Sequence, residues 1–209
     1  MSYIEIYVSE YPFEVESDSI YPIERQNEIK LCKNKSVAEN KFYVWKLLEY
    51  AAIKAKELNF CDIKFYKNPN GKWQCDNFEF SLSHSGNIIA VALSDKPFGI
   101  DVELKNAARF EKLSNKILTE AEKEKVLSIP KIKRGEAINK LWTVKEASFK
   151  LRGAGAFIPN KIETWGKTFE TKTVKSDSGE EYFLTVVSSD LQSTELNLTL
   201  MNGVKYGDE

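Results

Sequence analysis

The order of predicted elements along the chain indicates an α+β fold. An opening strand is followed by a helix, several strands, two helices and two closing strands, without the regular alternation of a parallel α/β sheet. The 209 residues can form one large domain or two small ones with a sizeable core. Hydrophobic residues make up 42% and charged residues 29%, as is typical of a globular protein.

The first half of the chain combines short apolar runs with one long helical pattern. Residues 3–8 predict a strand, and apolar residues three or four apart predict a helix over 37–58. A short strand is expected at 62–66. A turn is expected at 68–72, where proline fixes φ and glycine supplies a positive φ. The continuous apolar run 87–94 has the length of a buried strand.

The second half begins with a further strand at 97–104. Thr119 and Glu122 are spaced as in a capping box, which opens a helix. A second helix is expected from about Glu136 to Leu151. Two segments with alternating apolar residues near the end predict strands, arranged as a hairpin or meander. These segments are 181–189 and 195–201.

Charge and cysteine content exclude several classes of protein. Thirty basic residues balance 31 acidic ones, so bulk charge does not favour binding of nucleic acid. Three cysteines without metal-binding spacing indicate reduced thiols in a cytoplasmic protein. The start of the chain does not resemble a signal peptide, and no apolar run is long enough to span a membrane.

The strand at 97–104 carries two carboxylates on one face. Asp101 and Glu103 are two residues apart, which separates them by roughly 6.6 Å along the strand. Their repulsion is relieved by a cation between them, and Mg²⁺ prefers oxygen ligands of this kind. The alternative is a half-exposed strand with a solvated face.

The helix ending near Leu151 carries an unusual set of charges. Glu146 and Lys150 lie four apart on one face, as an ordinary surface pair would. Lys145 falls within the apolar sector of the helix, where a lysine must extend to solvent or find a partner. Gly153 is placed to end the helix in a left-handed cap.

The single histidine, His84, lies between Ser83 and Ser85 and before a glycine. These side chains offer several hydrogen-bond donors to a phosphate. A purely structural role for the histidine is the alternative.

Three motifs taken together resemble one family. They are FSLSHSG, FGIDVEL and LWTVKEASFKLRGAG, in this order, within about residues 65–160. The chain resembles the 4′-phosphopantetheinyl transferases of the surfactin-synthetase-activating type. This resemblance implies a pseudo-twofold α+β monomer with two similar lobes, residues 1–98 and 99–209, and an active site that binds coenzyme A between them.

The resemblance also implies roles for individual residues. Mg²⁺ would be held by Asp101, Glu103 and Glu146, and Lys150 would contact a phosphate. Ser83, His84 and Lys72 would bind the nucleotide portion of coenzyme A, although Trp73 stands where the family has proline. Basic residues early in the chain would contact coenzyme A, but the pattern here departs from the family's. The candidates are Arg25, Lys33 and Lys41.

The implied reaction moves the phosphopantetheine arm of coenzyme A to a serine of an apo carrier protein and releases 3′,5′-ADP. Lys150 and His84 would stabilise charge on the leaving phosphate. Glu146 is the best candidate for the base that takes the serine proton. The two rival functions are a Mg²⁺-dependent phosphohydrolase and a carrier-binding module without catalysis.

Carrier proteins of this kind are typically acidic around the serine. The segment 105–117 combines Arg109, Lys112 and Lys116 with Phe110 and Leu113, which suits an acidic helical partner. Ordinary packing of the two apolar residues into the protein is the alternative.

Overall fold

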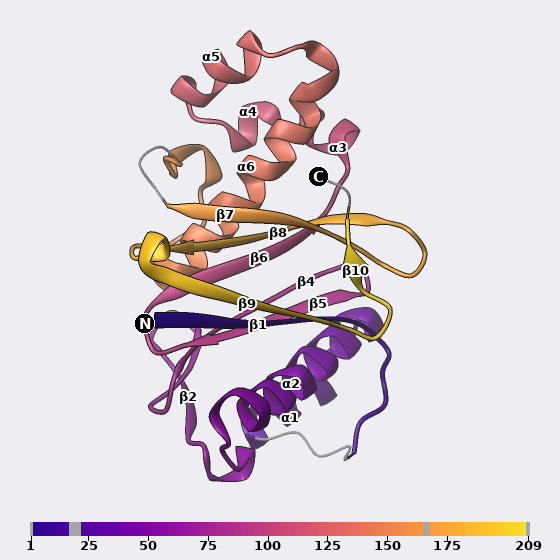
Figure 1. Ribbon diagram of the computed structural model, residues 1–209, viewed down its shortest axis with the longest axis vertical. Helices are drawn as coiled ribbons and strands as arrows, with labels where there is room; N and C mark the ends of the chain where they lie inside the picture. The colour runs from indigo at the N-terminus through magenta and orange to yellow at the C-terminus, as the bar shows by residue number, and fades with distance from the viewer. Residues whose placement is uncertain (1, 17–21, 165–167, 208–209) are drawn as a thin grey trace.

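The computed structural model describes residues 2–16, 22–164 and 168–207, and it has four layers (Figure 1). Two four-stranded sheets pack face to face, and one long helix covers the outer face of each. The strand order is β4-β5-β1-β9 in the first sheet and β10-β7-β8-β6 in the second. This arrangement confirms the predicted α+β class.

The first sheet and its helices are built mainly from the N-terminal half of the chain. The elements of this half are β1 (Ser2–Glu10), α1 (Ile23–Lys30), α2 (Lys35–Lys56), a 3₁₀ turn (Phe60–Asp62), β2 (Phe65–Lys67), β3 (Trp73–Cys75), β4 (Glu79–Ser85) and β5 (Ile88–Ser94). β2 and β3 pair only with each other, as a separate two-stranded sheet.

The remaining elements form the second sheet, its helices and one further strand of the first sheet. They are β6 (Phe98–Leu104), α3 (Ala107–Lys112), α4 (Ser114–Ile117), α5 (Glu120–Ser128), α6 (Lys131–Arg152), β7 (Phe169–Lys175), β8 (Glu181–Ser188), β9 (Thr194–Met201) and β10 (Lys205–Tyr206), with 3₁₀ turns at Pro159–Lys161 and Leu191–Ser193.

The two halves repeat one arrangement. β4-β5-β1 and β7-β8-β6 have the same antiparallel pairings, and α2 and α6 each contain 22 residues. In each half the first strand precedes the long helix, and the helix precedes the other two strands. The repeat confirms the expected pseudo-twofold fold with two similar lobes. The exact division at residues 98 and 99 stays a prediction.

The expectation of a C-terminal hairpin or meander was wrong. β8 pairs with β6 and β7 in the second sheet, whereas β9 pairs in parallel with β1 in the first. The 3₁₀ turn at 191–193 carries the chain from one sheet to the other. Alternating apolar residues identified the buried face of each strand, but they do not specify its neighbour.

The interior between the sheets is apolar. Ile4, Ile6 and Val8 of β1 pack with Ile100 and Val102 of β6 in one buried cluster. Every residue of β5 is buried, because one face contacts the second sheet and the other contacts α2. This double burial explains the continuous apolar run in the sequence.

The other face of β6 lies against α6. A Cβ on Gly99 would stand 2.0 Å from the carbonyl oxygen of Ala147, so only glycine permits this close approach. Asp101 and Glu103 follow on the same face of β6. The contact at Gly99 therefore brings both carboxylates alongside the helix.

Lys145 of α6 has a buried partner. Its ammonium lies 2.7 Å from Oε2 of Glu122, and it also donates to the carbonyls of Pro159 and Ile162. The side chains of Lys145 and Glu122 are 0% and 1% exposed. Glu122 is also the acidic member of the capping box with Thr119, which is confirmed. Lys145 thus links α6 to α5, through Glu122, and to the segment after α6 that contains Pro159 and Ile162.

None of the described helices is long and apolar enough to cross a membrane.

Replacing Lys145 with alanine should destabilise the fold strongly. Loss of one partner leaves a charged carboxylate buried, which costs about 3–5 kcal/mol in comparable pairs. Urea unfolding of Lys145→Ala measures this loss. Lys123→Ala is the control, because Lys123 pairs with the exposed Glu120 and its loss should cost less than about 1 kcal/mol. Equal stability of the two variants would contradict a stabilising buried pair.

The stability of the protein should also fall in acid through Glu122. Burial alone would raise the pKa of this carboxyl, but Lys145, the Thr119 amide and Thr164 hold it below its ordinary value. A lowered folded pKa means that the stabilisation is present above about pH 4.5 and is lost as the pH falls through the folded value. The difference in unfolding free energy between wild type and Glu122→Gln should therefore shrink below about pH 4.5. A constant difference from pH 7 to acid would refute this assignment.

Candidate active site

Three serine hydroxyls join β4 of the first lobe to β6 of the second. Ser81, Ser83 and Ser85 alternate along β4 and are buried. Their hydroxyls accept hydrogen bonds from three backbone amides of β6 at 3.0–3.1 Å, those of Ile100, Val102 and Leu104. We call this row the serine seam. It was not foreseen, although the spacing of serines in SLSHS is its signal.

Asp101 lies at the centre of the junction and is 4% exposed. Its Oδ1 accepts from Lys150 Nζ at 2.8 Å and from Ser83 Oγ at 2.7 Å. Its Oδ2 is buried without a hydrogen-bond partner. Burial raises the pKa of this carboxyl, even though Lys150 acts in the opposite direction. The solvated-face alternative for this strand is therefore wrong at Asp101.

Glu103 lies farther along the same face and is partly buried. Its Oε1 accepts from Arg109 at 3.2 Å and lies 3.5 Å from Ser85 Oγ. Burial raises the pKa of Glu103, and the charge of Asp101 adds to this effect. Arg109 and the nearby Trp142 of α6 act in the opposite direction and lower this pKa. Arg109 and Trp142 are contacts that the sequence did not predict.

Glu146 of α6 completes a group of three coupled carboxyls. Burial raises its pKa to about 7, and the charges of Asp101 and Glu103 contribute to the increase. Lys150, four residues later, acts in the opposite direction. Repulsion of Glu146 by two other carboxylates would be relieved by a cation close to them.

The donor set fits a hard divalent cation. All three side chains offer oxygen atoms, and the buried Oδ2 of Asp101 is available. Within the described residues, no three histidine, cysteine or acidic side chains are already gathered closely enough to hold an ion. In this arrangement Lys150 and Arg109 occupy oxygens of Asp101 and Glu103 instead.

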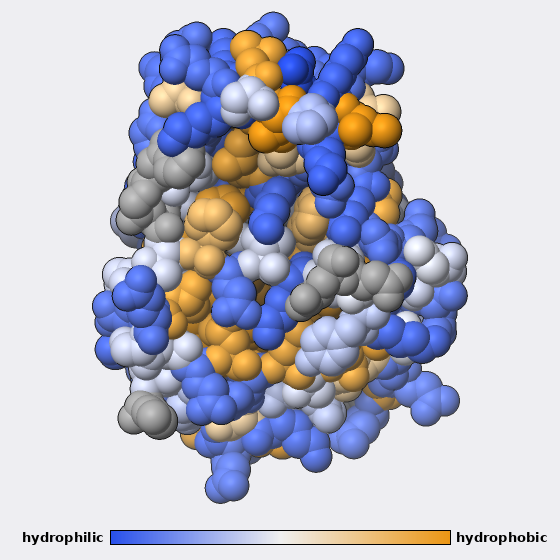
Figure 2. All heavy atoms as spheres, turned by 45° about the horizontal axis from the view of Figure 1, so that its top comes forward, coloured by the Kyte–Doolittle hydropathy of each residue, from blue (hydrophilic) through white to orange (hydrophobic). Residues whose placement is uncertain are grey.

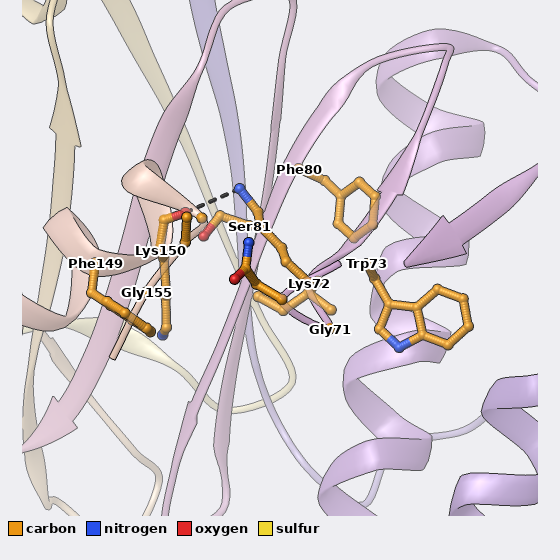
Figure 3. Close-up of a pocket in the computed structure, with 12 residues that line it drawn as sticks. Gly71, Lys72, Trp73, Phe80, Ser81, Phe149, Lys150 and Gly155 are labelled. Carbon is orange, nitrogen blue, oxygen red and sulfur yellow. Dashed lines mark hydrogen bonds between the residues drawn. The ribbon is translucent and has the colours of Figure 1, made fainter. Parts of the chain in front are cut away.

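A pocket of about 330 Å³ opens between the lobes (Figure 3), and Lys150, which contacts Asp101, lies in its wall. Lys72, Trp73 and Phe80 line it from the first lobe, and Phe149 and Lys150 line it from α6. The glycine-bounded loop 153–155 closes one side, and Gly153 caps α6 with a φ of 65° as predicted. Two lysines at an otherwise apolar pocket suit a ligand that has both phosphates and apolar parts.

Lys72 connects the lobes across this pocket. Its ammonium donates to the carbonyl of Lys150 at 3.0 Å, drawn as the dashed line in Figure 3. Burial lowers the pKa of Lys72. Asn68 supports the same helix end by donating to the carbonyl of Gly153 at 3.1 Å. Asn68 is a further residue that the sequence did not single out.

His84 and Ser83 point to opposite faces of β4, because side chains alternate along a strand. Ser83 is buried in the seam, whereas the His84 side chain is exposed. The surrounding protein nevertheless lowers the pKa of His84 by desolvation, and the charge of Lys150 adds to this effect. Only His84 of the two is accessible to a ligand in this arrangement.

The three early basic candidates differ in their surroundings. Arg25 is 8% exposed, donates to Glu28 and lies over the ring of Trp45 at 5.2 Å. Its charge still lowers the pKa of His84, so it lies within electrostatic reach of that imidazole. Lys33 is exposed before α2, and Lys41 is partly buried within α2. Their roles toward coenzyme A stay predictions.

The segment 105–117 forms α3 and α4 at the end of the molecule that comes forward in Figure 2. Phe110 is fully buried and Leu113 is partly buried, whereas Lys112 and Lys116 are exposed. Figure 2 shows a mostly hydrophilic surface there with scattered hydrophobic side chains. The apolar residues of the segment thus pack inward, and its basic residues face outward.

Comparison with known proteins agrees with this geometry. A family model described as the 4′-phosphopantetheinyl transferase superfamily matches residues 97–200. The chain belongs to this superfamily. The match begins at β6 and includes α6, the two elements that carry the three carboxyls.

Three relatives named 4′-phosphopantetheinyl transferase share this similarity. The psf-1 protein of Bacillus pumilus is 34% identical over 96 residues, which cover 44% of this chain and 41% of the relative. The gsp protein of Aneurinibacillus migulanus is 30% identical over 135 residues, 62% of this chain and 54% of the relative. The Sfp protein of Bacillus subtilis is 28% identical over 107 residues, 49% of this chain and 47% of the relative. The aligned chain therefore spans about half the length of these superfamily members.

Binding of a divalent cation at the carboxyls should release protons at neutral pH. A group with a pKa of about 7 is half protonated at pH 7, and a metal ion displaces its proton. We expect release of at least about half a proton per ion at pH 7 and almost none near pH 9. Calorimetry of Mg²⁺ binding in buffers with different ionisation enthalpies measures this number. Binding without proton release in wild type, or with equal release in Glu146→Gln, would contradict the role of Glu146.

Proposed function

We propose that the protein transfers the 4′-phosphopantetheine arm of coenzyme A to a serine of an apo carrier protein and releases 3′,5′-ADP, with Mg²⁺ as cofactor. One observation carries this proposal. Burial raises the pKa values of Asp101, Glu103 and Glu146 at the junction of the lobes, and Lys150, which contacts Asp101, lines the adjoining pocket together with Lys72. Membership of the superfamily supports the same reaction.

Asp101, Glu103 and Glu146 are the residues that would hold the cation. When bound, the ion would neutralise charge on the pyrophosphate of coenzyme A and favour in-line displacement. The burial of Asp101 and the free Oδ2 support this assignment.

Lys150, which lines the pocket, and His84, which does not, are the proposed remaining groups. Lys150 is placed to exchange its contact with Asp101 for a phosphate oxygen, and His84 offers a further donor. Both would stabilise charge on the leaving 3′,5′-ADP. Lys72, Arg25, Lys33 and Lys41 remain candidates for coenzyme A contacts, whereas Ser83, for which the family resemblance implies such a contact, is buried.

Glu146 is the proposed base. A bound cation would keep this carboxyl ionised at neutral pH, as a proton acceptor requires. Glu146 would take the proton of the carrier serine, whose oxygen forms a bond to the β-phosphorus as the bond to the leaving phosphate breaks. The pair Glu146 and Lys150 thus provides the catalytic groups.

The proposed protein partner is an acidic carrier protein. The exposed Lys112 and Lys116 of α3 and α4 support docking through charge, since Phe110 and Leu113 pack inward. We further propose that the protein is cytoplasmic, which the three unpaired cysteines support. We also propose that it is a monomer, as the family resemblance implies.

Mass spectrometry tests the function directly. Candidate apo carriers are incubated with coenzyme A and Mg²⁺, and a phosphopantetheine adduct on the carrier serine is the expected product. A control without carrier distinguishes a transferase from a phosphohydrolase, because only a hydrolase would release 3′,5′-ADP from coenzyme A alone. Binding of a carrier without either product would indicate a non-catalytic module.

Glu146→Gln should lower turnover far more than it changes affinity for coenzyme A. The amide keeps the size of the side chain but removes the base and one charge from the site. Loss of an interaction made in the transition state lowers kcat and kcat/KM together. Steady-state kinetics and calorimetric titration of the same variant measure both effects. Near-normal kcat with a much higher KM would make Glu146 a binding residue and leave the base unidentified.

A further inference from the structure

The hydroxyl of Ser83 is fully engaged inside the protein. It accepts from Val102 N at 3.1 Å and from Lys150 Nζ at 2.8 Å, and it donates to Asp101 Oδ1 at 2.7 Å. A serine hydroxyl has one proton and two lone pairs, so these contacts use its whole capacity. The side chain is also buried, since Ser83 is 4% exposed.

These contacts determine which oxygen of Asp101 remains available. Ser83 and Lys150 both bind Oδ1, and Oδ2 is left buried without a partner. Even if Lys150 turns toward a phosphate, Ser83 still holds Oδ1, because its bond to the β6 backbone anchors it. The orientation of the carboxylate therefore depends on Ser83.

We propose that Ser83 is a positioning residue that orients Asp101 for the cation, rather than a ligand of the coenzyme A phosphates. The proposal depends on the proposed function, and it differs from the role that the family resemblance implies for Ser83. Groups that hydrogen-bond to metal-binding carboxylates typically change metal affinity 10–100-fold when removed.

The serine seam provides a matched control. Ser81 is 3% exposed, lies on the same strand and accepts from Ile100 N at 3.0 Å. No hydrogen bond from its hydroxyl to a carboxylate is found among the described residues. Ser81→Ala and Ser83→Ala therefore each remove one seam contact to β6, but only Ser83→Ala also removes a contact to Asp101.

The test compares both alanine variants with wild type. Mn²⁺ binding in the presence of coenzyme A is followed by electron paramagnetic resonance. Binding of 3′,5′-ADP is measured by calorimetry in EDTA, and thermal unfolding is recorded for each protein. We expect both variants to lose thermal stability, and Ser83→Ala to lose more, because it also removes the contacts to Asp101 and Lys150. Only Ser83→Ala should weaken Mn²⁺ binding, by about 10–100-fold, with unchanged affinity for 3′,5′-ADP.

The reverse pattern would overturn the inference. If Ser83→Ala binds Mn²⁺ as Ser81→Ala does but binds 3′,5′-ADP several-fold more weakly, then Ser83 is a phosphate ligand. If Ser83→Ala does not fold, Ser83→Cys replaces the hydroxyl with a weaker donor. Wild-type Mn²⁺ affinity in that variant would equally contradict the proposal. Wild-type protein that binds neither Mn²⁺ nor coenzyme A would instead refute the proposed function itself.

Discussion

The serine seam is the contact on which the arrangement of both lobes and site depends. β6 pairs with β8 along one edge, and its other edge presents backbone amides that need acceptors. Three hydroxyls of β4 supply these acceptors, so the lobes meet through side chains where a continuous sheet would use backbone pairs. The same seam places Ser83 against Asp101. A structural joint and the candidate active site thus share atoms.

Basic side chains of the protein neutralise part of the negative charge near the serine seam. Asp101 contacts Lys150, Glu103 contacts Arg109, and Glu146 remains largely uncompensated with a pKa of about 7. Three carboxyls in a partly buried place would otherwise repel one another strongly. Lys150 and Arg109 therefore neutralise two of the three carboxylates at this junction.

The sequence predicted the helices and strands better than it predicted which elements and side chains contact one another. Apolar spacing located α2 and β5, and the capping box of Thr119 was visible in the letters. Lys145 was recognised as unusual because it falls in the apolar sector of its helix. Its partner Glu122 could not be predicted, because Glu122 lies on another helix and residue spacing describes contacts within a single helix. For the same reason, the spacing of serines in SLSHS could indicate a serine face, but not that β6 lies against it. The prediction that the three carboxyls share one site came only from the family resemblance, not from the residue pattern itself.

The parallel pairing of β9 with β1 has a consequence for how the chain assembles. Residues 2–9 form a ladder with residues 194–201, so the first sheet pairs the first strand of the described chain with a strand near its end. During synthesis, β1 leaves the ribosome long before β9 exists, and one edge of β1 stays without its neighbour until then. Contacts of such long sequence separation also slow folding, because a large loop must close first. The two lobes resemble separate modules, yet the first is completed only when the second has been made.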